Sequence, residues 1–262
     1  MSKVELSRMT WKETEVALRG NPVILLPMGS FEQHGPTAPM GDYRYADELA
    51  RRIAEGSRGN ALSLPAIPWG NSEYFKSFPG TLSIRPDTLR AVVADLAECV
   101  FDHGCDHLMF VCGHAGNMPP LEEVGRDIRR RRGVRVATVS PLAWITPQLR
   151  AEVYGSEHPN TGHGSEPMQS LGMYLFPEDV RSDLIEPGNA PKWRGERVQG
   201  TSTVFVDGQP VHMYLNYEEI TPNGVLGDPR LGSAEAGRRI VEHLVAVGVR
   251  MVDWFRGQDT KG

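Results

Sequence analysis

The chain has 262 residues and a formal net charge of -5; 40% of its residues are hydrophobic and 23% are charged. This composition is typical of a globular protein with one sizeable core, and the acidic balance argues against a nucleic-acid partner or an anionic membrane surface. No apolar run reaches the length of a membrane span, and the N-terminus lacks the apolar core of a signal peptide, so we expect a cytoplasmic protein. Cys99, Cys105 and Cys112 have neither metal-type spacing nor the number that a disulfide framework needs.

Short apolar runs bounded by glycine, proline or polar residues predict buried strands, and segments with helical periodicity lie between them. The predicted strands are 23–28, 61–66, 107–112 and 134–140, and the predicted helices are 45–55, 86–103 and 119–132. Strand–helix–strand alternation with short connections indicates a mostly parallel sheet that helices cover on both faces.

The last third of the chain has a different pattern. We expect a helix over 166–175, a β-hairpin over 201–220 with its turn at Asp207-Gly208, and a long terminal helix over 233–255. No low-complexity linker or internal repeat divides the chain. The expected fold is therefore a single α/β domain over 1–262, with a mostly parallel central sheet flanked by helices and an appended β-hairpin.

Polar clusters follow two of the predicted strands: "GSFEQHG" follows the first and "CGHAGN" follows the third. Because ligands of open α/β sheets bind beyond the carboxyl ends of the strands, we expect His34 and His114 on the same rim. Glu32 lies two residues before His34, so in an extended segment both side chains share one side.

Each candidate ligand also has an ordinary structural explanation. Asp42 opens a helix, where an acid is commonly a cap, and His114 could be a rim histidine bonded to a carbonyl. "TGHGSEP" adds His163 and Glu166 in a glycine-rich turn, where Glu166 could be a simple first-turn acid. Taken together, acids and histidines from three loops on one rim form a nitrogen and oxygen set suited to Zn²⁺ or Mn²⁺.

The combined set points to hydrolysis. Five ligands with a shared carboxylate suit two metal ions about 3.5–4 Å apart, which lower the pKa of a bridging water towards ~7 and hold hydroxide ready for attack. The sequence has no P-loop, no dinucleotide glycine fingerprint, no G-x-S-x-G elbow and no H-E-x-x-H. With those motifs absent, metal-dependent hydrolysis is the leading chemistry.

These motifs resemble the creatininase family of metal-dependent hydrolases. The matching segments, in family order, are "LLPMGSFEQHGP", "FPGTLSI", "FVCGHAGN", "GHGSEPMQS" and "PNGVLGDPRLGSAEAGRR". The resemblance implies an α/β fold with a parallel core sheet, a small-molecule substrate and frequently a homohexamer. It implies two divalent ions, Zn²⁺ and/or Mn²⁺ with Fe²⁺ as a further option, on the ligands Glu32, His34, Asp42 and His114. In the family pattern Asp42 is the bridge, and His163 is the catalytic residue that serves as general acid or base.

The chain departs from this pattern in the loop before the bridging acid. Thr37 replaces a second histidine, and Asp42 comes ten residues after Glu32, where relatives have eleven. The spacing of "DYRYA" into the helix favours Asp42 as the bridge, and Asp47 is the alternative.

Further departures concern the other ligands and the substrate wall. Gly116 and Met168 stand where relatives carry a glutamate, so we expect Glu166 to complete the metal site. Phe75 stands where relatives often place histidine, which makes that wall more apolar. The expected substrate-binding residues are Tyr74, Phe75 and Trp144.

The expected reaction is the hydrolytic opening of a small polar cyclic compound. Because "GHGSEPM" and "MYLFPEDVR" resemble the inositol-degrading subgroup, the leading expectation is C–C bond hydrolysis of 3-dehydro-scyllo-inosose. The alternative is a cyclic amide amidohydrolase similar to creatininase, or a formamide hydrolase. The shortened loop, Gly116 and Met168 leave an inactive metal-binding scaffold as a further hypothesis.

Overall fold

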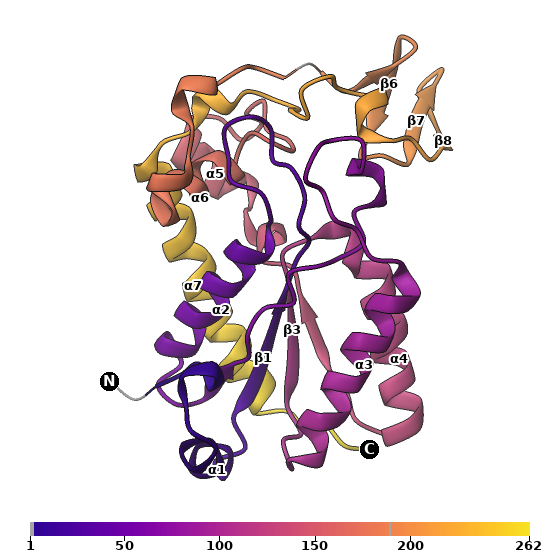
Figure 1. The fold of residues 1–262 in the computed structure, drawn as a ribbon. Coiled ribbons are helices and arrows are strands. Elements are labelled where there is room, and N and C mark those ends of the chain that lie inside the picture. Colours follow the sequence, from indigo (N-terminus) through magenta and orange to yellow (C-terminus); the bar gives the residue numbers. More distant parts are fainter. Residues whose placement is uncertain (1–2, 189) are drawn as a thin grey trace.

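A parallel sheet forms the centre of the computed structural model, which describes residues 3–188 and 190–262 (Figure 1). Its four strands lie in the order β2-β1-β3-β4, and every neighbouring pair is parallel. The strands are β1 (Val23–Met28), β2 (Ala61–Ser63), β3 (Leu108–Cys112) and β4 (Ala137–Val139). The predicted parallel sheet is confirmed, but β2 and β4 are shorter than their apolar runs. Pro65 lacks an amide N–H for the β2 ladder, and Val134 bridges to Lys261 instead of joining β4.

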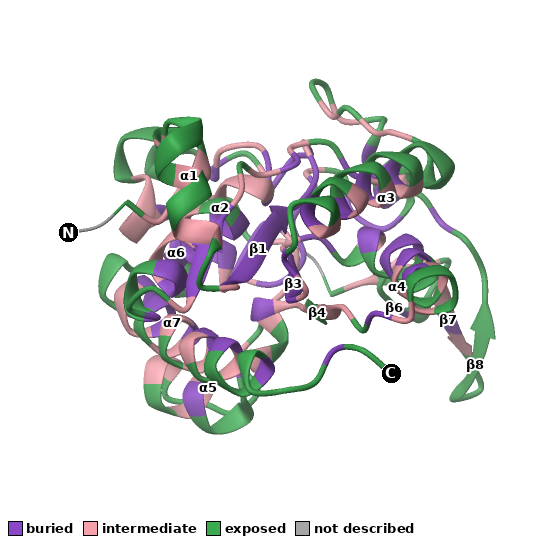
Figure 2. Ribbon diagram, turned by 90° about the horizontal axis from the view of Figure 1, so that it is seen from below, coloured by how far each residue is buried: buried purple, intermediate pink, exposed green. Residues whose placement is uncertain are grey.

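Helices cover both faces of this sheet, with α2 and α7 on one side and α3 and α4 on the other (Figure 1). Their bounds are α2 (Tyr43–Gly56), α3 (Pro86–Asp102), α4 (Met118–Arg132) and α7 (Ala234–Arg256). All six residues of β1 are buried, and Figure 2 shows the central strands enclosed by the helices. Side chains alternate along the strand, so that Leu26 packs toward α3 and α4 while Leu25 packs toward α2 and α7.

Three shorter helices complete the helical part: α1 (Trp11–Leu18), α5 (Pro147–Tyr154) and α6 (Met168–Leu175). We predicted neither α1 nor α5, because both are short and have weak apolar stripes: α1 buries no residue, and α5 buries Leu149 alone. The N-terminus of α1 is held by a capping box between Thr10 and Glu13. Within the described ranges, no helix is both long and apolar enough to cross a bilayer. The 3-10 turns are Leu6–Arg8, Glu73–Phe75, Ala115–Asn117, Pro141–Trp144, Pro177–Asp179, Ser182–Leu184, Tyr217–Glu219 and Pro229–Leu231.

The appended element is a four-stranded antiparallel sheet, larger than the expected hairpin. It consists of β5 (Lys192–Trp193), β6 (Glu196–Gln199), β7 (Thr203–Val206) and β8 (Gln209–His212), in that order. The predicted hairpin is β7–β8, and its two-residue turn has positive φ at Asp207 (49°) and Gly208 (76°). We missed β5 and β6 because they are short and mostly charged or polar, and so lack an apolar alternation.

Candidate metal centre and active site

A cavity of about 580 Å³ lies beyond the carboxyl ends of β1 and β3. This position is where open α/β sheets bind ligands. Of the nine residues predicted for the site, eight line this cavity, and Trp144 does not. The eight are Glu32, His34, Asp42, Tyr74, Phe75, His114, His163 and Glu166.

Asp42 occupies the N-cap position just before α2, but its side chain does not cap the helix. Its side chain makes no capping hydrogen bond. Instead Oδ1 accepts from the backbone N–H of Ser30 at 2.6 Å, and Oδ2 lies 3.0 Å from Nδ1 of His114. Asp47, one turn further along α2, is exposed and lies outside the cavity lining. The structure therefore brings Asp42, and not Asp47, to the other candidate ligands.

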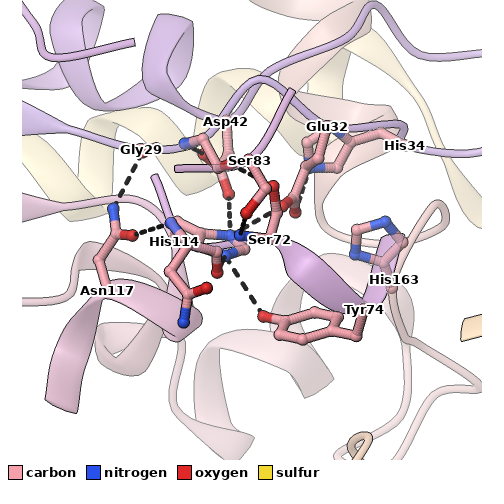
Figure 3. A network of polar contacts seen from close by, with 12 residues as sticks. Gly29, Glu32, His34, Asp42, Ser72, Tyr74, Ser83, His114, Asn117 and His163 are labelled. Carbon is pink, nitrogen blue, oxygen red and sulfur yellow. Dashed lines mark hydrogen bonds and ion pairs between the residues drawn. The ribbon is translucent and has the colours of Figure 1, made fainter. Parts of the chain in front are cut away.

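His114 presents one ring nitrogen to two carboxylates (Figure 3). Its Nδ1 lies 3.0 Å from Asp42 and 3.1 Å from Glu32. Its Nε2 lies 3.0 Å from the carbonyl oxygen of Asn71, which can only accept, so Nε2 carries a hydrogen and donates it. Burial would lower the pKa of His114, but Glu32 and Asp42 together raise it well above its ordinary value. The two carboxylates around Nδ1 thus favour a cation at that position. The hydrogen bond from Nε2 to the Asn71 carbonyl fixes the orientation of the ring, as such bonds do in metal-ligating histidines.

Glu32 belongs to two groups of possible ligands. In one, its carboxylate and ring nitrogens of His34 and His163 lie within 4.8 Å of one another; in the other, its partners are Asp42 and His114. The carboxylate shared between the groups is therefore Glu32, whereas the family pattern assigned the bridge to Asp42. Burial raises the pKa of Glu32 to about 7 and lowers that of His34 to about 4.

His163 stands between the ligand groups and an aromatic wall. Its ring stacks on His34 and Phe75, with centroids 4.9 and 4.3 Å away, and Tyr217 meets it edge-on at 4.9 Å. Its Nε2 donates to the carbonyl of Gln33 at 2.7 Å, which leaves Nδ1 without a hydrogen. Burial among these rings, and then the neighbouring His34, lower the pKa of His163 well below its ordinary value. The imidazole is therefore neutral at neutral pH, and its Nδ1 has a free lone pair that can accept a proton.

These residues fit a divalent cation. Glu32 is 1% exposed, and the donor near its Oε2 is Nδ1 of His114 at 3.1 Å, which Asp42 also contacts, so no described residue gives Oε2 a well-formed hydrogen bond of its own. An unsatisfied buried acceptor costs about 1–3 kcal/mol, and a carboxylate costs more, which a cation would offset. Carboxylate oxygens and imidazole nitrogens are ligands that Zn²⁺ and Mn²⁺ both accept.

The structure does not bring Glu166 to either ligand group. Its carboxylate accepts from the hydroxyl of Tyr154 at 2.7 Å, and from the backbone N–H (3.2 Å) and hydroxyl of Ser170. These bonds hold the side chain between α5 and α6, where burial raises its pKa. The expectation that Glu166 completes the metal site is corrected accordingly: it lines the cavity apart from both ligand groups.

Trp144 also lies elsewhere than expected. It is half-buried against the hydrophobic cluster formed by α2, α5, α6 and α7, and its carbonyl accepts from Nε2 of His243 at 3.1 Å. Leu142, from the same 3-10 turn, lines the cavity instead. The turn directs these two side chains differently, and the sequence "SPLAW" gave no sign of which one faces the site.

The position of Gly116 explains why no carboxylate stands there. A Cβ on this residue would lie 2.3 Å from the carbonyl oxygen of Asn71 and 2.6 Å from Nε2 of His114. The loop that carries Asn71 is itself fixed by Asn117, which accepts from the N–H of Asn71 and donates to the carbonyl of Gly29, both at 2.9 Å. Sequence reasoning missed Asn71 and Asn117, although Asn117 lies in the "GHAGN" motif.

The family model for creatininase, described as creatinine amidohydrolase, matches residues 7–252, and the chain belongs to this family of metal-dependent hydrolases. The mycofactocin precursor peptide peptidase of Mycobacterium ulcerans (strain Agy99) is 30% identical over 249 residues, 91% of this chain and 88% of that protein. The creatinine amidohydrolase of Pseudomonas putida is 36% identical over 202 residues, 71% of this chain and 77% of that protein.

More distant relatives also match most of the chain. The 3-dehydro-scyllo-inosose hydrolase of Thermotoga maritima is 23% identical over 265 aligned positions, 92% of this chain and 80% of that protein. A crystal structure of creatinine amidohydrolase superposes with a TM-score of 0.81 at 22% identity, covering 99% of this chain and 100% of that one. The α/β fold with its parallel sheet is thereby shown to be the creatininase fold.

Proposed function

We propose that the chain is a metal-dependent amidohydrolase that cleaves the C–N bond of an amide bound in the cavity. Glu32, His34, Asp42 and His114 would hold the metal ions, and His163 would move the proton. The observation that carries this proposal is the pair of possible ligand groups that share Glu32 in one cavity, one of which includes the neutral His163. The names of two relatives, a peptidase and an amidohydrolase, support an amide as the substrate.

Different residues of the cavity would have different roles in this reaction. When bound, divalent ions would acidify water and polarise the substrate carbonyl. His163, with Nδ1 unprotonated, would accept a proton and deliver it to the leaving nitrogen. Burial raises the pKa of Tyr74 to about 12, so its hydroxyl stays protonated and can donate to a substrate oxygen. Phe75 and Tyr217 pack around His163 and limit the access of water to it.

C–C bond hydrolysis of 3-dehydro-scyllo-inosose is the second candidate. It is supported by the relative of that name, which matches 92% of this chain, and by the similarity of "GHGSEPM" and "MYLFPEDVR" to its subgroup. We place it second because its identity of 23% is below the 30% and 36% of the two amide-cleaving relatives.

The test is turnover by the purified protein after supplementation with Zn²⁺ or Mn²⁺, against creatinine, short peptides, formamide and the inosose. Hydrolysis of an amide supports the proposal, and turnover of the inosose alone replaces it with the second candidate. His163→Gln should lower kcat by about 10²–10⁴-fold while the bound metal is retained. A folded protein that binds metal but turns over none of these compounds would support the inactive scaffold, and a folded protein that binds no metal after supplementation would overturn the proposed function.

Several finer expectations stay predictions. They are two ions per chain, the identity of the native metal, a cytoplasmic location and a homohexamer. Metal analysis of the purified protein and its mass in solution test the ion count and the hexamer directly.

A further inference from the structure

The cavity is lined by a single arginine, Arg150 of α5, and by no lysine among the described residues. Elsewhere in the described chain, most arginines near acids form ion pairs, such as Arg44 with Asp179 at 2.6 Å. Arg150 forms none with any described acidic side chain, although Glu32, Asp42 and Glu166 line the same cavity.

Most of the donors of Arg150 are free of protein partners. Its guanidinium has five N–H groups, and in the described ranges it makes a single side-chain hydrogen bond, from Nη1 to the hydroxyl of Thr161 at 3.3 Å. The residue is half-buried, so its charge is only partly solvated. A planar guanidinium in this state favours a planar anion that takes two parallel N–H groups, which describes a carboxylate.

Glu166, an acid that lines the same cavity, already has neutral hydrogen-bond donors. Tyr154, one turn after Arg150 on α5, donates its hydroxyl to Glu166 at 2.7 Å, and Ser170 donates two further hydrogen bonds to the same carboxylate. Neutral donors therefore satisfy Glu166, and the guanidinium stays available to a ligand. The positions i and i+4 place Arg150 and Tyr154 on the same face of the helix, so both extend from α5 toward the cavity side.

We propose that Arg150 binds a carboxylate of the substrate, and that the enzyme acts on amides that carry a free carboxylate, such as a short peptide with an unblocked C-terminus. The reaction in this statement rests on the proposed amidohydrolase function, whereas the binding preference does not. The carboxylates that line the cavity, Glu32, Asp42 and Glu166, would repel an anion, so the guanidinium is the group that favours a substrate carboxylate.

The experiment compares N-acetyl-trialanine with the same peptide carrying a C-terminal carboxamide. Binding is measured by calorimetry on the full chain loaded with Zn²⁺, in a His163→Gln background that suppresses turnover. We expect the carboxylate peptide to bind about 10- to 100-fold more tightly, as for charge-assisted hydrogen bonds. Arg150→Gln should remove this preference and Arg150→Lys should keep part of it. Arg126→Gln, an exposed change on α4, should leave it intact.

Equal binding of the two peptides, no binding of the carboxylate peptide, or a preference that survives Arg150→Gln would each overturn the assignment. Thermal unfolding of Arg150→Gln and Arg150→Lys checks that both variants fold. In the active enzyme, Arg150→Gln should raise KM for the carboxylate peptide and leave kcat nearly unchanged. A carboxylate preference in binding, without turnover of any amide, would overturn the proposed function and leave the role of Arg150 standing.

Discussion

The parallel sheet and the antiparallel sheet of this chain differ in how far their strands are buried. Every residue of β1 is buried, whereas every residue of β8 is exposed. The ends of β1 and β3 carry the acids and histidines, while Gly200, Thr201 and Ser202, between β6 and β7, line the cavity from the other sheet. The buried sheet holds the geometry of the reacting groups, and the exposed sheet frames the space that a substrate enters. Ligand groups need the rigid element, because small misplacements weaken metal binding.

The largest expected effect comes from comparing two acids near the start of α2, the N-cap residue Asp42 and the helical residue Asp47. Asp42→Asn removes a charge from the ligand group around His114 and should lower activity by more than about 100-fold, together with the metal content. Asp47→Asn, five positions along the same helix, changes an exposed side chain and should leave both near the wild-type level. Equal losses in the two variants, measured as turnover and bound metal, would contradict the assignment of Asp42.

The difference in burial also predicts a difference in stability. Leu26→Ala empties a fully enclosed site in β1 and should lower the free energy of unfolding by about 2–5 kcal/mol. Val211→Ala in β8, where the side chain is 44% exposed, should change it by about 0.5 kcal/mol or less. Urea unfolding of the metal-free proteins measures both. A loss at Val211 as large as that at Leu26 would mean that the antiparallel sheet is as tightly packed as the parallel one.

The smallest expected effect is the dependence of metal affinity on pH, which reflects the protons bound by the ligand groups. The pKa of His114 is raised well above 6.5 and that of Glu32 to about 7, so both bind protons near pH 6 in the metal-free protein. A cation must displace those protons, so its affinity should rise with pH between 6 and 8, by at most about tenfold per unit for each proton released. His34, whose pKa is lowered to about 4, should release none. Calorimetry of Zn²⁺ binding in buffers of different ionisation enthalpy counts the protons, and a pH-independent affinity would refute the scheme.

The outcome at Asp42 and at Glu166 shows what local patterns can establish. Both acids precede or open helices, and either could have been a simple helix-end acid. The structure turns Asp42 away from a capping role because the N–H of Ser30 and the ring of His114 reach it from other strand ends. Glu166 is taken by Tyr154 and Ser170, which come from α5 and α6. Spacing along the chain could not separate the two cases, since the partners of Asp42 are distant in sequence and Tyr154, a partner of Glu166, lies on α5, which we did not predict.

The sequence by itself determined the parallel sheet, the chemistry of the ligand set and the family. Buried strands must be apolar throughout, and a metal site needs acids and histidines at strand ends, so both leave a readable pattern. Only the tertiary structure decided which carboxylate the ligand groups share and which aromatic side chains face the cavity. It also decided that Arg150 lines the cavity without an ion pair to any acid in the described ranges. These features depend on contacts between α5, α6, the 71–75 loop and the strand ends. A single chain encodes such contacts through the combined packing of many residues, and no local motif records them.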